Sequence, residues 1–265
     1  MPTMEYTIHK PEIGKGGFSR VFRGTDMGCG RAVALKKSRC SLVIKKPHLR
    51  HESRILQLLQ SHPAIPAIYG YAHLPHFEYL AMELLGESVS DLQPDGTKIA
   101  PKTVVSVVLQ TMSALQHIHK LGIVHRDIKQ GNLMCSLNDP SRIKLIDFGI
   151  SRMFYEGEPK RRDPATKGYK MVGTLDWASL NAHDGIALSA RDDFESLAHV
   201  ALDLLRGDLP WGYRPWLEPR RIAQEEVRAS KRSHTAESLG AGFPPEFSSL
   251  LTYSRSLRFN QLPDY

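Results

Sequence analysis

The chain has 265 residues, a net charge of +7, 41% hydrophobic residues and 24% charged residues. These fractions are ordinary for a soluble globular protein and exclude a disordered chain. The length suffices for one large domain or for two lobes that share a cleft. The apolar runs are shorter than the ~18 residues of a membrane helix, and residues 1–5 lack the basic and apolar segments of a signal peptide.

The net charge bears on the possible partners of the protein, and the cysteines bear on its cellular compartment. A positive net charge is compatible with acidic, phosphorylated or nucleic-acid partners and does not decide between them. Cys29, Cys40 and Cys135 cannot all pair and show no C-x-x-C spacing. We therefore expect an intracellular protein without structural zinc. The short apolar runs predict no association with a membrane.

A glycine-rich segment follows the first predicted strand. Gly14, Gly16 and Gly17 lie between residues 6–13 and the alternating run 21–24, which predicts a second strand. An ordinary hairpin and a dinucleotide-binding turn are alternatives, but the latter should open a helix. A glycine-rich hairpin is typical of a lid over ATP phosphates, because glycines let backbone amides face the phosphate oxygens.

A lysine and a glutamate form the next candidate pair. Lys36 ends the apolar strand 31–36, and a helix is predicted over 47–60 with Glu52 on a face of leucines. A glutamate on an apolar face requires a cation. Lys36 is the favoured partner, and an exposed ion pair with an arginine of the same helix is the alternative.

Two further strands, at 67–71 and 79–86, should complete an antiparallel sheet of five strands. After them, Pro101 opens a predicted helix that Gly122 ends. Near its end lie two histidines, His117 and His119. Because they are two residues apart they point to different helix faces, so favourable placement at the negative end of the helix dipole is a better interpretation than a metal site.

A later helix begins with the spacing of a capping box at Ser189–Asp192 and runs to Gly207. Its inner faces are nearly all apolar, which predicts a central position in its part of the protein. The 149–189 segment before it is long, irregular and basic, and loops of that length are usually functional or disordered.

The segment 123–149 holds the candidate catalytic residues. Asp127, Lys129, Asn132 and Asp147 are framed by short apolar runs that predict strands. This combination suits phosphoryl transfer: Asp127 would accept the proton of an attacking hydroxyl and Lys129 would lie beside the moving phosphoryl group. Asn132 and Asp147 would hold Mg²⁺, which prefers oxygen ligands. A capped turn with solvated charges is the alternative.

The His-Arg-Asp-x-x-x-x-Asn sequence at 125–132 and the Asp-Phe-Gly sequence at 147–149 resemble the catalytic loop and the metal motif of protein kinases. Other stretches are similar to the casein kinase I family in particular, among them Ser-Leu-Asn where most kinases have Ala-Pro-Glu. These stretches are residues 82–86, 177–181, 191–197, 209–211 and 256–265. The resemblance extends from about Ile13 to Tyr265.

The resemblance implies an α+β, two-lobe protein kinase fold, with a five-stranded antiparallel sheet plus one helix in the N-lobe and a mainly helical C-lobe. The expected arrangement is a single kinase domain over 1–265, with an N-lobe to about residue 85 and a C-lobe over 86–265 that ends before the usual last helix. Lys36 and Glu52 would place the α- and β-phosphates of ATP. Thr174 would touch Asp127 and Lys129, and Asp193 would accept backbone hydrogen bonds from the catalytic loop.

The residues expected around the nucleotide share small or apolar side chains or a backbone role. They are Ile13, Gly14, Gly16, Gly17, Val21, Ala34, Lys36, Met82, Glu83, Leu85, Met134 and Ile146. Glu83 and Leu85 would bind adenine through their backbone, and Met82 would border the rear of the pocket. The alternative for the 79–86 stretch is a plain core strand, in which Met82 is buried as well.

Four positions depart from the family pattern. Ser19 replaces the usual third glycine, and Gln130-Gly131 replaces a proline and an acid in the catalytic loop. Asp176 stands where the casein kinase I family has an arginine that binds phosphorylated substrates, although Lys231 and Arg232 could supply a second basic contact. A preference for phosphorylated substrates is therefore not expected.

The sequence as a whole favours an ATP- and Mg²⁺-dependent kinase for serine or threonine in acidic proteins, acting as a monomer and without nucleic acid. A pseudokinase scaffold is the main alternative, supported only by Ser19 and Gln130-Gly131. A small-molecule phosphotransferase would not need Lys129, Thr174 and the long basic segment. A nucleic-acid binder is permitted by the charge, but no RNA or DNA motif is present.

Overall fold

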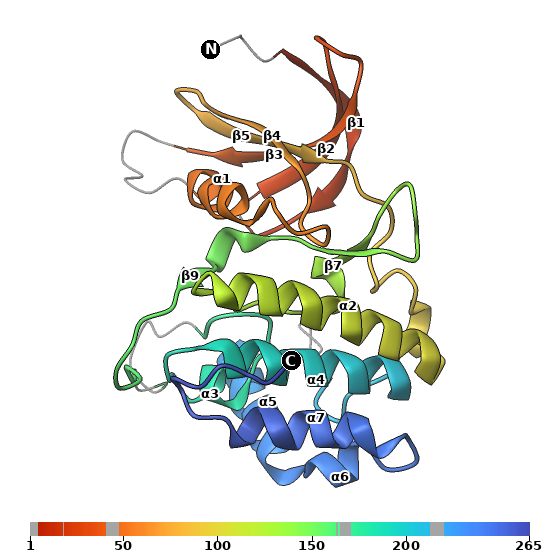
Figure 1. Ribbon diagram of the computed structural model, residues 1–265, viewed down its shortest axis with the longest axis vertical. Helices are drawn as coiled ribbons and strands as arrows, with labels where there is room; N and C mark the ends of the chain where they lie inside the picture. Colours follow the sequence, from red (N-terminus) through yellow and green to blue (C-terminus); the bar gives the residue numbers. More distant parts are fainter. Residues whose placement is uncertain (1–4, 18, 41–47, 163, 165–170, 213–219) are drawn as a thin grey trace. The chain divides into compact units, whose positions relative to one another are not determined.

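The computed structural model describes residues 5–17, 19–40, 48–162, 164, 171–212 and 220–265. The chain divides into two compact units: Met1–Gly86 with Met134–Gly149, and Glu87–Leu133 with Ile150–Tyr265. Figure 1 labels most strands of the first unit and the helices of the second. Among the described residues, no helix combines the length and the apolar character needed to cross a bilayer.

The first unit is built on a five-stranded antiparallel sheet with the order β1-β2-β3-β5-β4. Its strands are β1 (Tyr6–Lys15), β2 (Ser19–Asp26), β3 (Ala32–Arg39), β4 (Ile68–His73) and β5 (Phe77–Glu83). The predicted sheet is confirmed. However, β5 ends three residues before the predicted strand, because the amide of Gly86 bonds to Cys135 O instead of to a sheet partner.

The two faces of this sheet carry different side chains, because successive residues of a strand alternate between faces. On one face Val33, Leu35 and Ala81 form a buried cluster. The ladder pairs Val21 with Lys36 and Ala34 with Met82, which places these four residues on the other face. Several residues expected around a nucleotide therefore share one face of the sheet.

One helix, α1 (His48–Leu59), packs on this sheet against β3, β4 and β5. The predicted buried face is confirmed, since Glu52 and the leucines around it are buried. Pro47, where the helix was expected to begin, lies outside the described residues. The segment Met134–Gly149 belongs to the same unit. It contains β8 (Ile143–Leu145) and all but the first residue of β7 (Leu133–Cys135), and these two strands pair with each other.

The second unit is mainly helical. Its helices are α2 (Pro101–Lys120), α3 (Leu180–His183), α4 (Ala190–Arg206), α5 (Arg220–Ser233), α6 (Ala236–Leu239) and α7 (Pro245–Ser256). Helix α4 lies between α2 and α7 and contacts both (Figure 1). Most of its residues are buried, which confirms its predicted central position. The only strand pair assigned within the described part of this unit is β6 (Ile123–Val124) with β9 (Arg152–Met153).

The ends of α2 and α4 follow the sequence signals. Pro101 is the first residue of α2, and Gly122 has a φ of 71° just after its end. At the start of α4, Asp192 Oδ2 accepts a hydrogen bond of 2.7 Å from the amide of Ser189. Gly207 ends α4 in the left-handed conformation, with a φ of 90°. A side chain there would collide with Gly96, because a Cβ would lie 2.0 Å from its carbonyl oxygen.

Candidate active site

The first group of candidate residues is the lysine cluster, which consists of Lys36, Glu52 and Asp147. Lys36 Nζ donates to both oxygens of Glu52, at 3.0 and 2.8 Å, and to Oδ1 of Asp147 at 2.8 Å. The predicted Lys36–Glu52 contact is confirmed. Asp147 as a third member was not predicted, because residues 36 and 147 are far apart in sequence.

The charge of Lys36 is held by its two acidic neighbours. Burial acts against the charged form, but the carboxylates of Glu52 and Asp147 outweigh it and raise the pKa of Lys36. The side chain of Glu52 is 2% exposed, whereas that of Asp147 is 39% exposed. The cluster thus presents a permanent cation and an accessible carboxylate, which are the groups needed to bind phosphates and a divalent cation.

Glu78 fixes the helix that carries Glu52, and sequence reasoning missed it. Its carboxylate is fully buried and accepts bonds from the amides of Leu49 (3.0 Å) and Arg50 (3.1 Å), the first turn of α1. These amides have no partner within the helix. The signal that could have found it is the alternation in β5, which places an acid on the same face as the buried Leu80.

The residues expected to surround adenine all belong to the first unit. Val21, Ala34 and Met82 lie on the same sheet face as Lys36. Ala34 and Met82 are each 8% exposed. Gly14 is paired with Val21 across the β1–β2 ladder. This part of the expected pocket is therefore an apolar surface next to the lysine cluster.

Other expected nucleotide residues are placed in the structure without a contact that shows their role. Gly16 and Gly17 lie at the tip of the β1–β2 hairpin, where Gly16 N donates to Ser19 O at 2.8 Å. This confirms a hairpin rather than a turn that opens a helix. Phe18 lies outside the described residues. Ile13, Leu85, Met134 and Ile146 are exposed or partly exposed.

Glu83 was expected to bind adenine through its backbone. Its amide already donates to Ala67 O at 2.8 Å, and its side chain accepts bonds from Ala67 N and Lys144 Nζ. The backbone contacts that Glu83 and Leu85 would make with adenine stay a prediction.

The second group is the catalytic-loop cluster of the second unit, which consists of Asp127, Lys129, Asn132 and Thr174. Lys129 Nζ donates to Asp127 Oδ2 and to Thr174 Oγ1, at 2.9 Å each. Thr174 Oγ1 donates to Asp127 Oδ1 at 2.7 Å. The predicted contacts of Thr174 with the aspartate and the lysine are confirmed. This closed network holds the carboxylate of Asp127 in one orientation.

Asp193 in α4 anchors this loop, as predicted from the resemblance. Its carboxylate accepts bonds from the amides of His125 and Arg126, at 2.8 Å each. A third bond comes from His119 Nε2 at 2.8 Å, and His119 Nδ1 bonds to the hydroxyl of Tyr265. Burial alone would raise the pKa of Asp193, but these hydrogen bonds outweigh burial and lower it.

His119 does lie in the last turn of α2, as predicted, but its partners were not predicted. His119 is buried and binds an acid from another helix, which sequence spacing cannot reveal. Gln130 is a second residue whose role was missed. Its Nε2 donates to Gln93 Oε1 and to Asp203 Oδ2, at 2.8 Å each, and so ties the loop to α4.

The backbone is strained at Asp147 and at Arg126, the residue before Asp127. Among the described residues, Arg126 and Asp147 are the only non-glycine residues with positive φ, at 72° and 66°. Such conformations are uncommon and cluster at functional sites. Gly173 also has a φ of 92°, and a Cβ there would lie 2.8 Å from the carbonyl oxygen of Arg126. The loop that carries Thr174 therefore approaches the catalytic loop so closely that it requires glycine.

The two predicted metal ligands have suitable donor atoms. Asn132 uses its Nδ2 to donate to Asp127 O at 2.8 Å and Oδ2 at 3.2 Å, which leaves its amide oxygen as the atom that can bind a cation. Asp147 supplies an accessible carboxylate. Oxygen donors of this kind fit Mg²⁺. Asp147 belongs to the first unit and Asn132 to the second.

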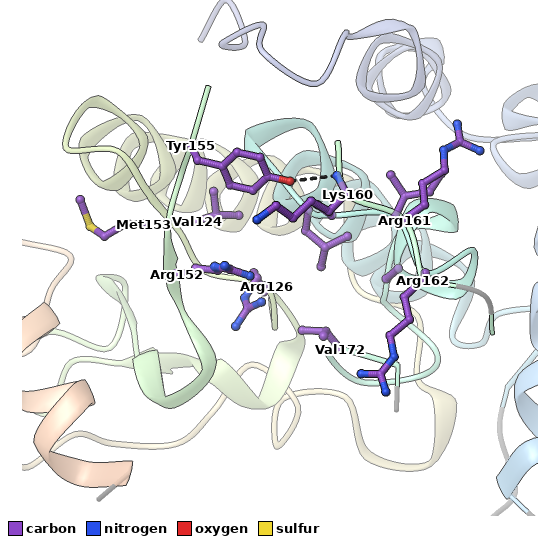
Figure 2. A pocket seen from close by; sticks show the side chains of 14 residues that line it. Val124, Arg126, Arg152, Met153, Tyr155, Lys160, Arg161, Arg162 and Val172 are labelled. Carbon is purple, nitrogen blue, oxygen red and sulfur yellow. Dashed lines mark hydrogen bonds between the residues drawn. The ribbon is translucent and has the colours of Figure 1, made fainter. Parts of the chain in front are cut away.

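A basic pocket of about 220 Å³ lies next to the catalytic loop in the second unit. Figure 2 shows Arg126 and Arg152 within it, and Lys160 facing the ring of Tyr155. Burial and then the charge of Arg152 lower the pKa of Arg126. Two further basic residues of the 149–189 segment, Lys167 and Lys170, lie outside the described residues. The pocket favours an anionic ligand because several cations share it.

Lys231 and Arg232 were expected to offer a second basic contact to a phosphorylated substrate. For Lys231 this expectation is wrong. Its side chain is fully buried, and Nζ donates to Leu175 O at 3.0 Å and Ala178 O at 2.6 Å. Arg232 is exposed but pairs with Asp184 at 2.8 Å. Lysine is rarely buried, so the sequence pattern indicated a surface charge.

These geometries define a class of protein, an α+β phosphotransferase. Its lysine on the sheet pairs with a glutamate on the neighbouring helix, the first hairpin of the sheet is rich in glycine, and a lysine and a threonine hold the catalytic aspartate. The chain matches the family model described as "Protein kinase domain" over residues 7–253 and belongs to the protein kinase family. The predicted two-lobe kinase fold is confirmed. Protein kinases use ATP and a divalent metal ion and act on protein substrates. The extent of the kinase domain over 1–265 stays a prediction.

Proposed function

We propose that this chain is an active serine/threonine kinase that uses Mg²⁺-ATP and prefers acidic protein substrates. The observation that carries the proposal is the network joining Asp127, Lys129 and Thr174. A lysine two residues after the aspartate and a threonine near the end of the basic segment are typical of serine/threonine kinases, and tyrosine kinases generally lack that lysine.

Each residue has a defined part in the proposed reaction. Asp127 orients the substrate hydroxyl and accepts its proton, while the hydroxyl oxygen forms a bond to the γ-phosphorus. The bond between that phosphorus and the oxygen bridging to the β-phosphate breaks, and ADP leaves. Lys129 stabilises the charge in transfer, and Lys36, held by Glu52, places the phosphates. A metal held by Asn132 and Asp147 would neutralise phosphate charge.

The preference for acidic substrates is supported by the basic pocket. Arg126 is the residue before Asp127, and Arg152 and Lys160 line the same pocket. Substrates that already carry a phosphate at the site used by the casein kinase I family are not expected to be preferred. Asp176 reverses the charge there, and Lys231 is buried.

We also propose that the chain belongs to the casein kinase I branch. The Ser-Leu-Asn segment that marks this branch supports the assignment through its contacts. Ser179 Oγ and Asn181 Nδ2 both donate to Asp192 Oδ1 in α4, at 2.7 and 2.9 Å. We further propose an intracellular compartment, in which free cysteines such as these three are typical. We also propose that the chain acts as a monomer.

A peptide-array assay with ATP labelled at the γ-phosphate tests this proposal. Acidic serine and threonine peptides should be labelled more strongly than neutral peptides and no less strongly than pre-phosphorylated ones, and tyrosine peptides should remain unlabelled. Asp127→Asn serves as the inactive control. Binding of Mg²⁺-ATP without any transfer would instead support a pseudokinase scaffold.

A further inference from the structure

A row of backbone carbonyls is held by buried side chains in the segment after Thr174. Each carbonyl oxygen from 175 to 178 is within hydrogen-bond distance of such a group: Lys231 Nζ at Leu175 (3.0 Å), Trp211 Nε1 at Asp176 (2.9 Å), His199 Nδ1 at Trp177 (3.2 Å) and Lys231 Nζ at Ala178 (2.6 Å). The donors come from α4, α5 and the chain between them. Loops seldom have every carbonyl bonded in this way, because most loop carbonyls face water.

Lys231 is central to this arrangement, because it binds the first and the last of the four carbonyls. Its Nζ also lies 3.3 Å from His183 Nε2 and 5.4 Å from the centroid of the Trp211 ring. Among the described residues, no carboxylate forms an ion pair with it within 4.0 Å. Burying an amine without an acid at ion-pair distance is costly, and the bonds to the two carbonyls offset part of that cost.

The segment that Lys231 holds lies against the catalytic loop. Gly173 closely approaches the carbonyl of Arg126, and Thr174 bonds to Asp127 and Lys129. The amides of Trp177 and Ala178 turn back to Thr174 O, at 3.2 and 2.9 Å. A shift of the 175–178 backbone would therefore move Thr174 as well.

We propose that Lys231 is a positioning residue for the protein substrate. By holding the carbonyls of Leu175 and Ala178, it keeps the 174–178 segment in one conformation beside Asp127 and so sets the affinity for the peptide without touching it. This inference rests on the proposed kinase function. It goes further, because it assigns substrate affinity to a buried residue outside the catalytic loop.

The test compares Lys231→Met with Arg221→Met, which removes an exposed charge from the same helix. Lys231→Met should raise the KM for an acidic peptide by about 10-fold or more, the loss expected when the two hydrogen bonds to the segment are removed. The KM for ATP should change by less than about 2-fold, because the lysine cluster is intact. Arg221→Met should match the wild type in both.

A second readout does not depend on activity. Hydrogen exchange at the amides of Trp177 and Ala178 should become about 10-fold faster or more in Lys231→Met. Equal rises in both KM values, or wild-type exchange and peptide KM, would overturn the inference. If the wild type transfers no phosphate, the proposed function fails and the exchange rates alone decide the inference. If Lys231→Met does not fold, Trp211→Phe, which removes the donor to Asp176 O, replaces it in both measurements.

Discussion

Thr174 Oγ1 donates to Asp127 Oδ1 at 2.7 Å while accepting a bond from Lys129 Nζ at 2.9 Å. One hydroxyl thus bridges the two candidate catalytic residues of the loop. A carboxylate bound by both a cation and a hydroxyl is restricted in its rotation. Such restriction is what positioning catalysis requires, because little covalent chemistry is left for the protein in phosphoryl transfer.

Replacing this hydroxyl tests its importance. Thr174→Val should lower kcat by about 10- to 100-fold, because a hydrogen bond to a charged group contributes about 1.5–3 kcal/mol. Thr174→Ser keeps the hydroxyl and should stay within about 3-fold of the wild type. Steady-state kinetics on an acidic peptide would measure both. Equal activity of the valine and serine variants would contradict a role for the bridge.

Asp147 is expected to be essential because it is the accessible acid of the lysine cluster. Asp147→Asn should lower kcat by about 100-fold or more, the order seen when one preorganised electrostatic group is removed. The matched control is Asp139→Asn, an exposed aspartate in the same unit whose carboxylate binds the neighbouring Ser141 and Arg142. Near wild-type turnover of Asp147→Asn would show that the proposed metal ligand is not needed.

Glu78 should contribute to stability and, through α1, to activity. Glu78→Gln retains one acceptor but loses the charge that faces two helix amides and the hydroxyl of Tyr71. The free energy of unfolding should fall by about 1–3 kcal/mol, as measured by urea denaturation. Glu5→Gln, an exposed acid in the same unit, should leave it unchanged. A loss equal to that of Glu5→Gln would contradict the capping role.

Lys231 should make stability depend on pH. Burial lowers its pKa from 10.5 to about 7; Glu195 and Asp176 act in the opposite direction and Arg255 in the same one, and His183 also lies next to it. Because the folded pKa lies below the unfolded one, the unfolded state binds more protons between these values. The contribution of Lys231 to stability therefore increases as pH rises through this window.

Denaturation curves of the wild type and Lys231→Met measure this effect, since other groups titrate in both. The difference in unfolding free energy should shift in favour of the wild type by at most about 1.4 kcal/mol per pH unit, the limit for a single proton. Measurements at about pH 6.5, 8 and 9.5 cover the window. A difference that stays constant across these values would show that Lys231 is charged in both states.

Much of the fold follows from short-range patterns. The leucine face of α1 predicted its burial together with that of Glu52, and Pro101 and Gly122 predicted the limits of α2 to within two residues. Alternation and turns were sufficient for five antiparallel strands. These features depend on neighbours within one turn or one strand, which the sequence contains directly.

The catalytic residues were also predictable, although their geometry was not. Asp127, Lys129 and Asn132 lie within six residues of one another, so their spacing was sufficient to suggest their chemistry. The addition of Asp147 to the Lys36–Glu52 pair depended on how the chain folds back. Only the structure shows that Lys36 holds both carboxylates.

The sequence by itself determined which side chains could do chemistry and which helices and strands would carry them. The tertiary structure alone decided the partners of Glu78, His119, Gln130 and Lys231. Each of these polar groups is buried, and burial is tolerated only where hydrogen bonds replace those to water. Their partners come from distant parts of the chain, so no local pattern could show that Lys231 supports a backbone loop instead of facing solvent.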